Sequence, residues 1–192
     1  MLAVRKMKNN IRKFWLPITA GLLVLACIAS CLAPILIPED PISLARSMSR
    51  VEFPNGTTIV TNYDTGSGLP IPGGASDGYT FLVLQIPPEK IGEFTTTLIT
   101  SPFWKPLPLS SELADHEKYI QPSFMYGVEE TIPIATATGY YLFIDRQEEY
   151  NISAGKQVYE IATPFYERSS YNFTFCLFND KDGKLYLWRI DT

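Results

Sequence analysis

The sequence predicts an α+β domain, an antiparallel sheet of five or six strands with one main helix packed on a face, preceded by a single N-terminal membrane segment. Three observations lead to this expectation. Residues 14–37 carry no charge. Several later segments are rich in β-branched and aromatic residues, which favours strands. Residues 87–101 place apolar side chains at helical spacing directly after one of these segments.

The uncharged run from Phe14 to Ile37 is the expected membrane segment. Its 24 residues suffice to cross a hydrocarbon core about 30 Å thick at about 1.5 Å per residue. Five basic and no acidic residues precede it, whereas Glu39 and Asp40 follow it. By the positive-inside rule, this asymmetry predicts a basic cytoplasmic tail, residues 1–13, and an exported C-terminal part.

Three kinds of tether are compatible with this run. An uncleaved spanning helix explains why hydrophobicity continues to Ile37, and it tolerates Pro17 and Pro34 because both lie near its ends. Residues 28–31 (IASC) resemble the lipobox of bacterial lipoproteins, which would make Cys31 the lipid attachment site. A cleaved signal needs a small-residue cleavage site, which is poor here because Pro34 follows the small residues. All three place residues 39–192 outside the cytoplasm, and the spanning helix and the lipid anchor also hold the protein at the cell membrane with its C-terminal domain outside.

Beyond the membrane segment the chain is acidic. Removing the five basic residues of the tail from the 16 in the chain leaves 11 against 20 acidic side chains, a formal charge of −9. This charge argues against nucleic acid as a partner and against electrostatic adhesion to anionic lipid or wall polymer. Only Cys176 lies beyond the membrane segment and the chain holds one histidine, so a zinc site of Cys and His is excluded and no cofactor is expected.

Residues 38–50 are expected to form a juxtamembrane stalk, because Pro41 to Arg50 contains Pro, three Ser and two Arg but few apolar residues. The extracytoplasmic domain is expected to comprise residues 51–192. Its first strand is predicted at Thr57 to Asn62, a β-branched run that precedes a glycine- and proline-rich loop. Tyr79 to Ile86 is apolar on both faces, which predicts a central strand covered on two sides.

The main helix is predicted to begin at residues 87–88, because these two prolines suit a first helical turn. Ile91, Phe94 and Leu98 then fall on one face, and we expect this face to pack on the sheet. Pro102 is expected to end the helix.

The remainder of the chain is expected to return to β structure. Residues 103–109 should be extended, and residues 111–119 should form one short polar helix. Four further strands are predicted from apolar and β-branched runs, at Ile132–Ala137, Gly139–Arg146, Asn172–Phe178 and Lys184–Ile190. The last two flank Asn179–Gly183, a turn whose glycine supplies the positive φ of a hairpin.

The ending YNFTFCLFNDKDGKLYLWRIDT, residues 171–192, resembles the terminal hairpin of uncharacterised membrane-anchored extracytoplasmic proteins of Gram-positive bacteria. The layout of basic tail, membrane segment and exported domain is similar as well. The resemblance implies export to the cell envelope, and it assigns no role to any residue.

Two short motifs match known functional patterns, but the residues around them do not fit those patterns. Residues 74–78 (GASDG) match the G-x-S-x-G pattern of serine hydrolases, but that pattern needs a strand before Ser76 and a helix after it, whereas a loop precedes and a strand follows. Residues 180–183 suggest a calcium loop, but Phe178 and Arg189 stand where the first and last ligands belong. We therefore assign no catalytic residue and no metal ligand.

Phe103 and Trp104 stand close to prolines on both sides and are the candidate contacts for a ligand or partner. The chain lacks a recognisable set of His, Cys, Ser and carboxylates, which favours a non-enzymatic interaction or envelope-accessory module. Its partner would be another envelope protein or a wall component. The alternative is an envelope hydrolase that uses a pair of carboxylates as acid and base.

Overall fold

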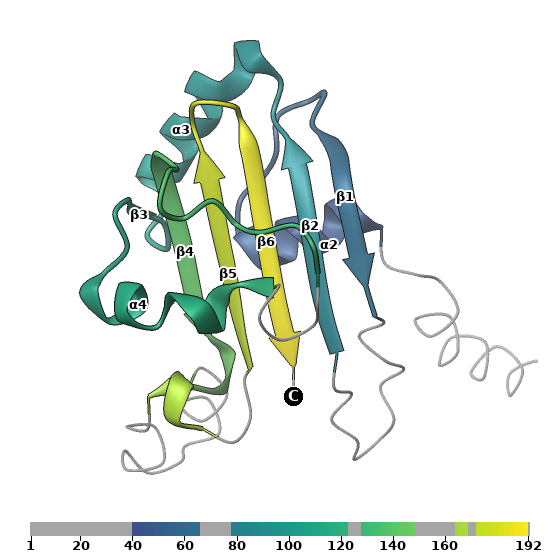
Figure 1. The fold of residues 1–192 in the computed structure, drawn as a ribbon. Helices are drawn as coiled ribbons and strands as arrows, with labels where there is room; N and C mark the ends of the chain where they lie inside the picture. The colour runs from purple at the N-terminus through teal and green to yellow at the C-terminus, as the bar shows by residue number, and fades with distance from the viewer. Residues whose placement is uncertain (1–39, 66–77, 123–127, 149–163, 169–171, 192) are drawn as a thin grey trace, which may run out of the picture. The chain divides into compact units, whose positions relative to one another are not determined.

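The computed structural model describes residues 40–65, 78–122, 128–148, 164–168 and 172–191. In these ranges six strands form one antiparallel sheet in the order β1-β2-β6-β5-β4-β3 (Figure 1). The strands are β1 Thr58–Asp64, β2 Gly78–Gln85, β3 Lys105–Pro106, β4 Gly139–Asp145, β5 Asn172–Asn179 and β6 Lys184–Asp191. A six-stranded antiparallel sheet with helices packed on it confirms the expected α+β class.

The predicted membrane segment, residues 14–37, lies outside the described residues, as do the basic tail and Cys31. Ser76 and most of the glycine-rich loop around it also lie outside them. Among the helices that the structure describes, none has both the length and the apolar character needed to span a bilayer.

The inner strands are buried on both faces because their sequences are apolar at successive positions. In β2, Leu82 and Leu84 join the hydrophobic cluster on one face, while Phe81 and Val83 join the cluster on the other. β2 is covered on two sides as predicted, and it lies next to the edge strand β1. The β5–β6 hairpin is confirmed, and its turn holds Gly183 at a φ of 69°.

Strand β1 confirms the first predicted strand and forms one edge of the sheet. Its register with β2 shifts between Ile59 and Thr61, and the side chains of Ile59, Val60 and Tyr63 are exposed. Such a bulge bends an edge strand and makes it a poorer template for further pairing.

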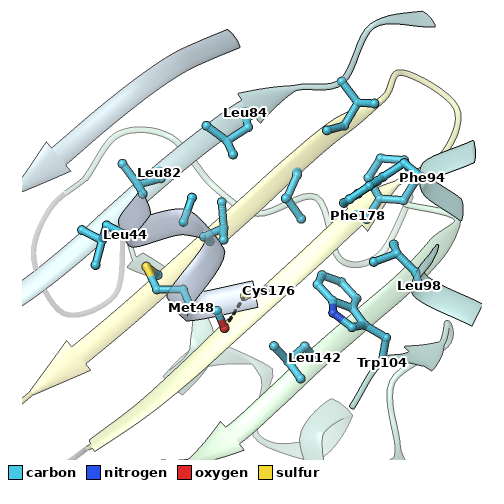
Figure 2. Packing of buried hydrophobic residues seen from close by; sticks show 14 of the residues in the cluster. Leu44, Met48, Leu82, Leu84, Phe94, Leu98, Trp104, Leu142, Cys176 and Phe178 are labelled. Carbon is cyan, nitrogen blue, oxygen red and sulfur yellow. Dashed lines mark hydrogen bonds between the residues drawn. The ribbon is translucent and has the colours of Figure 1, made fainter. Parts of the chain in front are cut away.

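Helix α2, Pro41–Ser49, occupies most of the segment expected to form a stalk. Its side chains Leu44, Ala45 and Met48 are buried against the sheet, and the Met48 carbonyl oxygen lies 3.8 Å from the Cys176 sulfur (Figure 2). The expectation of a juxtamembrane stalk is therefore wrong for Pro41–Ser49. Its few apolar residues fall on one side of a helix, so they suffice to bury that side.

Local signals define both ends of α2. The Asp40 carboxylate accepts a hydrogen bond from the Ser43 N–H at 3.2 Å and so caps the first turn. At the other end Arg50 adopts the left-handed conformation, and its N–H donates to the Arg46 carbonyl at 2.8 Å. The compact unit that contains the sheet therefore begins at Asp40 instead of Val51.

The main helix is confirmed. A single 3₁₀ turn, η1 Pro88–Lys90, leads into helix α3, Ile91–Thr100. Phe94 and Leu98 are buried on the same face of the sheet as α2, and Ile91 packs partly against them (Figure 2). The backbone becomes extended at Ser101, the residue before Pro102, because proline disfavours a helical conformation in the residue that precedes it.

The opposite face of the sheet is covered by short elements. The polar helix predicted at residues 111–119 is present as α4, Ser111–Asp115, followed by a 3₁₀ helix η2, Glu117–Ile120. Another 3₁₀ turn, η3 Phe165–Glu167, buries Phe165 in the same layer. Figure 1 shows α4 on the side of the sheet opposite to α2.

The prediction of a strand at residues 132–137 is wrong, because these residues form a turn across this second face. The Ala137 N–H donates to the Pro133 carbonyl at 2.9 Å. The Gln121 side chain satisfies both the N–H and the carbonyl of Ile132, at 3.0 and 2.9 Å. A distant side chain thus supplies the hydrogen bonds that a neighbouring strand would have supplied.

Candidate functional site

The two aromatic residues proposed as contacts do not form one exposed pair. Trp104 is buried, and its indole N–H donates to the Ser49 carbonyl of α2 at 2.9 Å. Phe103 is exposed, and the Arg50 guanidinium lies 4.6 Å from its ring centroid. The prediction for Trp104 is wrong because α2 supplies both a cover and a hydrogen-bond acceptor for the indole, and Phe103 alone stays at the surface.

Cys176 is a buried small hydrophobe. It is fully buried between α2 and the sheet, and this burial raises the pKa of its thiol far above the ordinary value. A thiol kept protonated in an apolar cluster is neither a nucleophile nor a metal ligand.

His116 is held in an aromatic stack. Its ring centroid lies 3.4 Å from that of Tyr166, with an angle of 23° between the planes. Desolvation raises the pKa of the Tyr166 hydroxyl, and the carboxylates of Glu167, Glu112 and Asp115 add to this effect. The stack joins α4 to η3. Within the described ranges, no three His, Cys, Asp or Glu residues gather as metal ligands.

A charged cavity of about 450 Å³ lies along the outer edge of β4, and we call it the β4-edge cavity. Its walls come from β3, α4, β4 and η3. The lining residues are Lys105, Ser110, Glu112, Leu113, Tyr141, Phe143, Asp145, Glu148, Pro164, Phe165 and Arg168. Its volume is that of a site for a small ligand.

The cavity exists because β3 is too short to cover β4. β3 pairs with β4 only at Lys105–Tyr141 and Pro106–Tyr140. The preceding residue, Trp104, belongs with Leu142 to the hydrophobic cluster on the α2 face, and the ladder does not continue to it. In the part of the chain that the structure describes, no strand therefore pairs with the outer edge of residues 142–145.

The floor of the cavity is aromatic and rigid. The rings of Phe143 and Phe165 have centroids 4.9 Å apart, and Phe173 lies 5.7 Å from Phe165. The Tyr141 side chain is buried, and its hydroxyl accepts a hydrogen bond from the Ser110 N–H at 3.2 Å. These contacts fix α4 and η3 against β4.

An ion pair closes one wall of the cavity. The Arg168 Nη1 lies 2.7 Å from both oxygens of Asp145, and the side chains are only 13% and 11% exposed. The Glu148 N–H also donates to Asp145 Oδ1 at 3.0 Å. The Asp145 carboxylate is therefore neutralised and hydrogen-bonded, which suits a structural role.

Three charges around the cavity are unpaired. Lys105, Glu112 and Glu148 are exposed, and within the described ranges their side chains form no hydrogen bond or ion pair. Nothing in the sequence marks these residues, because they lie far apart along the chain and share no motif. The structure brings them to one cavity, where their charges can meet a ligand.

A second cavity, of about 410 Å³, lies beside residues 107–109 and 134–139 and is largely apolar. It contains one carboxylate, that of Glu117, which accepts a hydrogen bond from the Gln121 amide at 3.4 Å. The β4-edge cavity carries more chemistry for recognition, because its unpaired charges have both signs.

Comparison of the chain with protein-family models, curated proteins and solved structures finds no match.

Proposed function

We propose that this chain is a membrane-tethered extracytoplasmic protein whose domain acts as a non-enzymatic interaction module through the β4-edge cavity. The uncharged run at residues 14–37 and the charge asymmetry around it support the tether. The partner is another envelope protein or a wall component. The acidic domain surface is consistent with a partner that is not polyanionic.

One observation carries the interaction role: the cavity combines a preformed aromatic floor with unpaired charges at its mouth. Lys105, Glu112 and Glu148 are the unpaired groups, while Asp145 is already engaged by Arg168. A rigid apolar floor with a few placed polar groups is the usual construction of a binding site.

Site-specific photocrosslinking in cells tests this role. A photoreactive residue at Ser110, an exposed lining position, is expected to capture a partner. The same residue at Thr96, exposed on α3 and on the other side of the sheet, is the matched control. Adducts at Thr96 but not at Ser110 would place the interaction elsewhere and refute the role of the cavity.

A second candidate, an envelope hydrolase with a carboxylate pair, is favoured by one feature. Glu112 and Glu148 line the same cavity and have no partner within the described residues. In a hydrolase, Glu112→Gln and Glu148→Gln would each preserve capture at Ser110 and lengthen the lifetime of the bound partner, because acid and base would be lost. In an interaction module both substitutions weaken capture.

The tether is tested by one substitution outside the described residues. For an uncleaved anchor, Cys31→Ser leaves the membrane fraction unchanged and the mature protein keeps its N-terminal tail. For a lipoprotein, the native protein is shorter by about 30 residues and carries a diacylglyceryl group. Cys31→Ser then blocks both the cleavage and the lipid attachment. Intact-mass measurement separates the two forms, and protease shaving of protoplasts tests export of the domain.

A further inference from the structure

We infer that the β4-edge cavity binds a short extended peptide with free termini, which adds to the sheet as a strand antiparallel to β4 and in line with β3. This inference rests on the proposed binding role of the cavity and names a free short peptide, in place of a whole envelope protein, as its ligand. It follows from the direction of main-chain groups on β4, from the place where β3 ends, and from the charges at the two ends of the cavity.

The hydrogen-bond register shows which β4 residues face the open edge. The Leu107 N–H donates to the Gly139 carbonyl at 2.9 Å, and Lys105 pairs with Tyr141, two residues along each strand. On the other side, the Asp180 N–H donates to the Thr138 carbonyl at 3.0 Å. Main-chain groups alternate in direction along a strand, so odd-numbered residues of β4 point toward β3 and even-numbered ones toward β5.

The next odd-numbered residues, Phe143 and Asp145, lie beyond the end of β3 and line the cavity. Their main-chain N–H and carbonyl groups face the outer edge, where no strand pairs with them among the described residues. An unpaired strand edge is a template for an extended peptide. Trp104 precedes Lys105 and takes the place opposite Leu142, so residues 143–145 remain; they span about 10 Å at about 3.3 Å per residue, which accommodates roughly three peptide residues.

The charges select the direction of the peptide. A peptide in line with β3 runs antiparallel to β4, so its C-terminus ends beside Lys105 and its N-terminus lies toward Asp145 and Glu148. Lys105 then faces the terminal carboxylate, and the unpaired Glu148 faces the terminal ammonium. The parallel direction would place like charges together at both ends, which is unfavourable.

The α4 wall selects a side chain. In this register the C-terminal peptide residue stands opposite Phe143, and directly opposite residues in an antiparallel pair share a face of the sheet. That face carries α4, whose Glu112 lines the cavity and is unpaired within the described part of the chain. A basic C-terminal residue therefore fits best.

Calorimetric titration of the full-length chain in detergent micelles tests the inference with the tripeptide Ala-Ala-Lys. Amidation of its C-terminus and acetylation of its N-terminus should each weaken binding about fivefold to tenfold. Lys105→Gln should abolish the effect of amidation alone, and Glu148→Gln the effect of acetylation alone. Lys181→Gln and Glu129→Gln, which alter exposed charges outside the cavity, should change neither.

Two peptide series need no protein variant and probe the main chain and the side chain separately. N-methylation of the lysine removes the N–H that pairs with Phe143 and should abolish binding, whereas N-methylation of the second alanine, whose N–H points away, should be tolerated. Ala-Ala-Glu should bind more weakly than the lysine peptide, and Glu112→Gln should remove this preference.

Other outcomes overturn the inference. Equal effects of the two N-methyl groups would exclude strand pairing in this register. If Lys105→Gln abolished the effect of acetylation, the peptide would run in the opposite direction. If no peptide binds while the photoreactive residue at Ser110 still captures a partner, the peptide inference fails and the proposed function stands. If no peptide binds and the photoreactive residue at Ser110 captures no partner, the proposed function fails as well.

Discussion

The Met48→Ala substitution tests whether α2 belongs to the folded domain. Met48 is 3% exposed and shares a cluster with Leu44, Leu82 and Cys176 (Figure 2). Truncating a buried methionine to alanine removes its transfer free energy and leaves a cavity, at a cost of about 2–5 kcal/mol. With a urea dependence of about 1–3 kcal/mol per M, a loss of about 3 kcal/mol lowers the unfolding midpoint by roughly 1–3 M.

Equilibrium unfolding in urea of a fragment that begins at Asp40, followed by tryptophan fluorescence, measures this change. Trp104 is a suitable reporter because its indole is hydrogen-bonded to Ser49, the last residue of α2. Ser47→Ala is the matched control, since Ser47 is exposed on the same helix. If Met48→Ala changed the free energy of unfolding by less than about 0.5 kcal/mol, as surface substitutions do, α2 would not pack as described and the argument would fail.

Three further predictions concern the same domain. Trp104→Phe should destabilise it by about 1–3 kcal/mol in thermal unfolding, because the buried Ser49 carbonyl loses its hydrogen-bond donor. Phe103→Leu, at an exposed position, should be nearly neutral, and equal effects of the two substitutions would contradict the burial of Trp104. Cys176 should resist alkylation in the native protein at about pH 8.5 and react after unfolding, because burial raises the pKa of its thiol; peptide mass mapping that shows native labelling would refute this. Gly183→Ala should lower the free energy of unfolding by about 1–2 kcal/mol, because φ is 69° and the new Cβ would lie 2.9 Å from Ile91 Cδ1. Gly92→Ala, whose new Cβ meets nothing within 4 Å, should not destabilise α3. Equal melting temperatures of the two variants would contradict this difference.

Elements whose signals are local were predictable from the sequence. The β5–β6 hairpin joins two adjacent apolar strands through a turn glycine. Two prolines lead through η1 into α3, which carries an apolar face at helical spacing. In these cases the residues that specify the element lie within or next to it. The same holds for Cys176, whose apolar neighbours in sequence already indicate burial.

Elements that depend on distant partners were not predictable in this way. Residues 132–137 contain the β-branched pattern of a strand, yet the Gln121 side chain takes both hydrogen-bonding groups of Ile132 and the chain turns. Phe103 and Trp104 are neighbours with similar hydropathy. Only the Ser49 carbonyl of α2, far away in sequence, decides that Trp104 is the one that is buried.

The β4-edge cavity belongs entirely to the tertiary structure. Lys105, Glu112 and Glu148 come from three separate segments. They line one cavity only in the folded chain, where β3 pairs with Tyr140 and Tyr141 and leaves the rest of β4 without a neighbouring strand in the described residues. Sequence by itself determined the local backbone preferences, the alternation of apolar side chains and the acidic balance of the domain. The tertiary structure decided which edge of the sheet remains open and which charges surround it, because strand order and burial depend on surfaces supplied by residues that are remote in the chain.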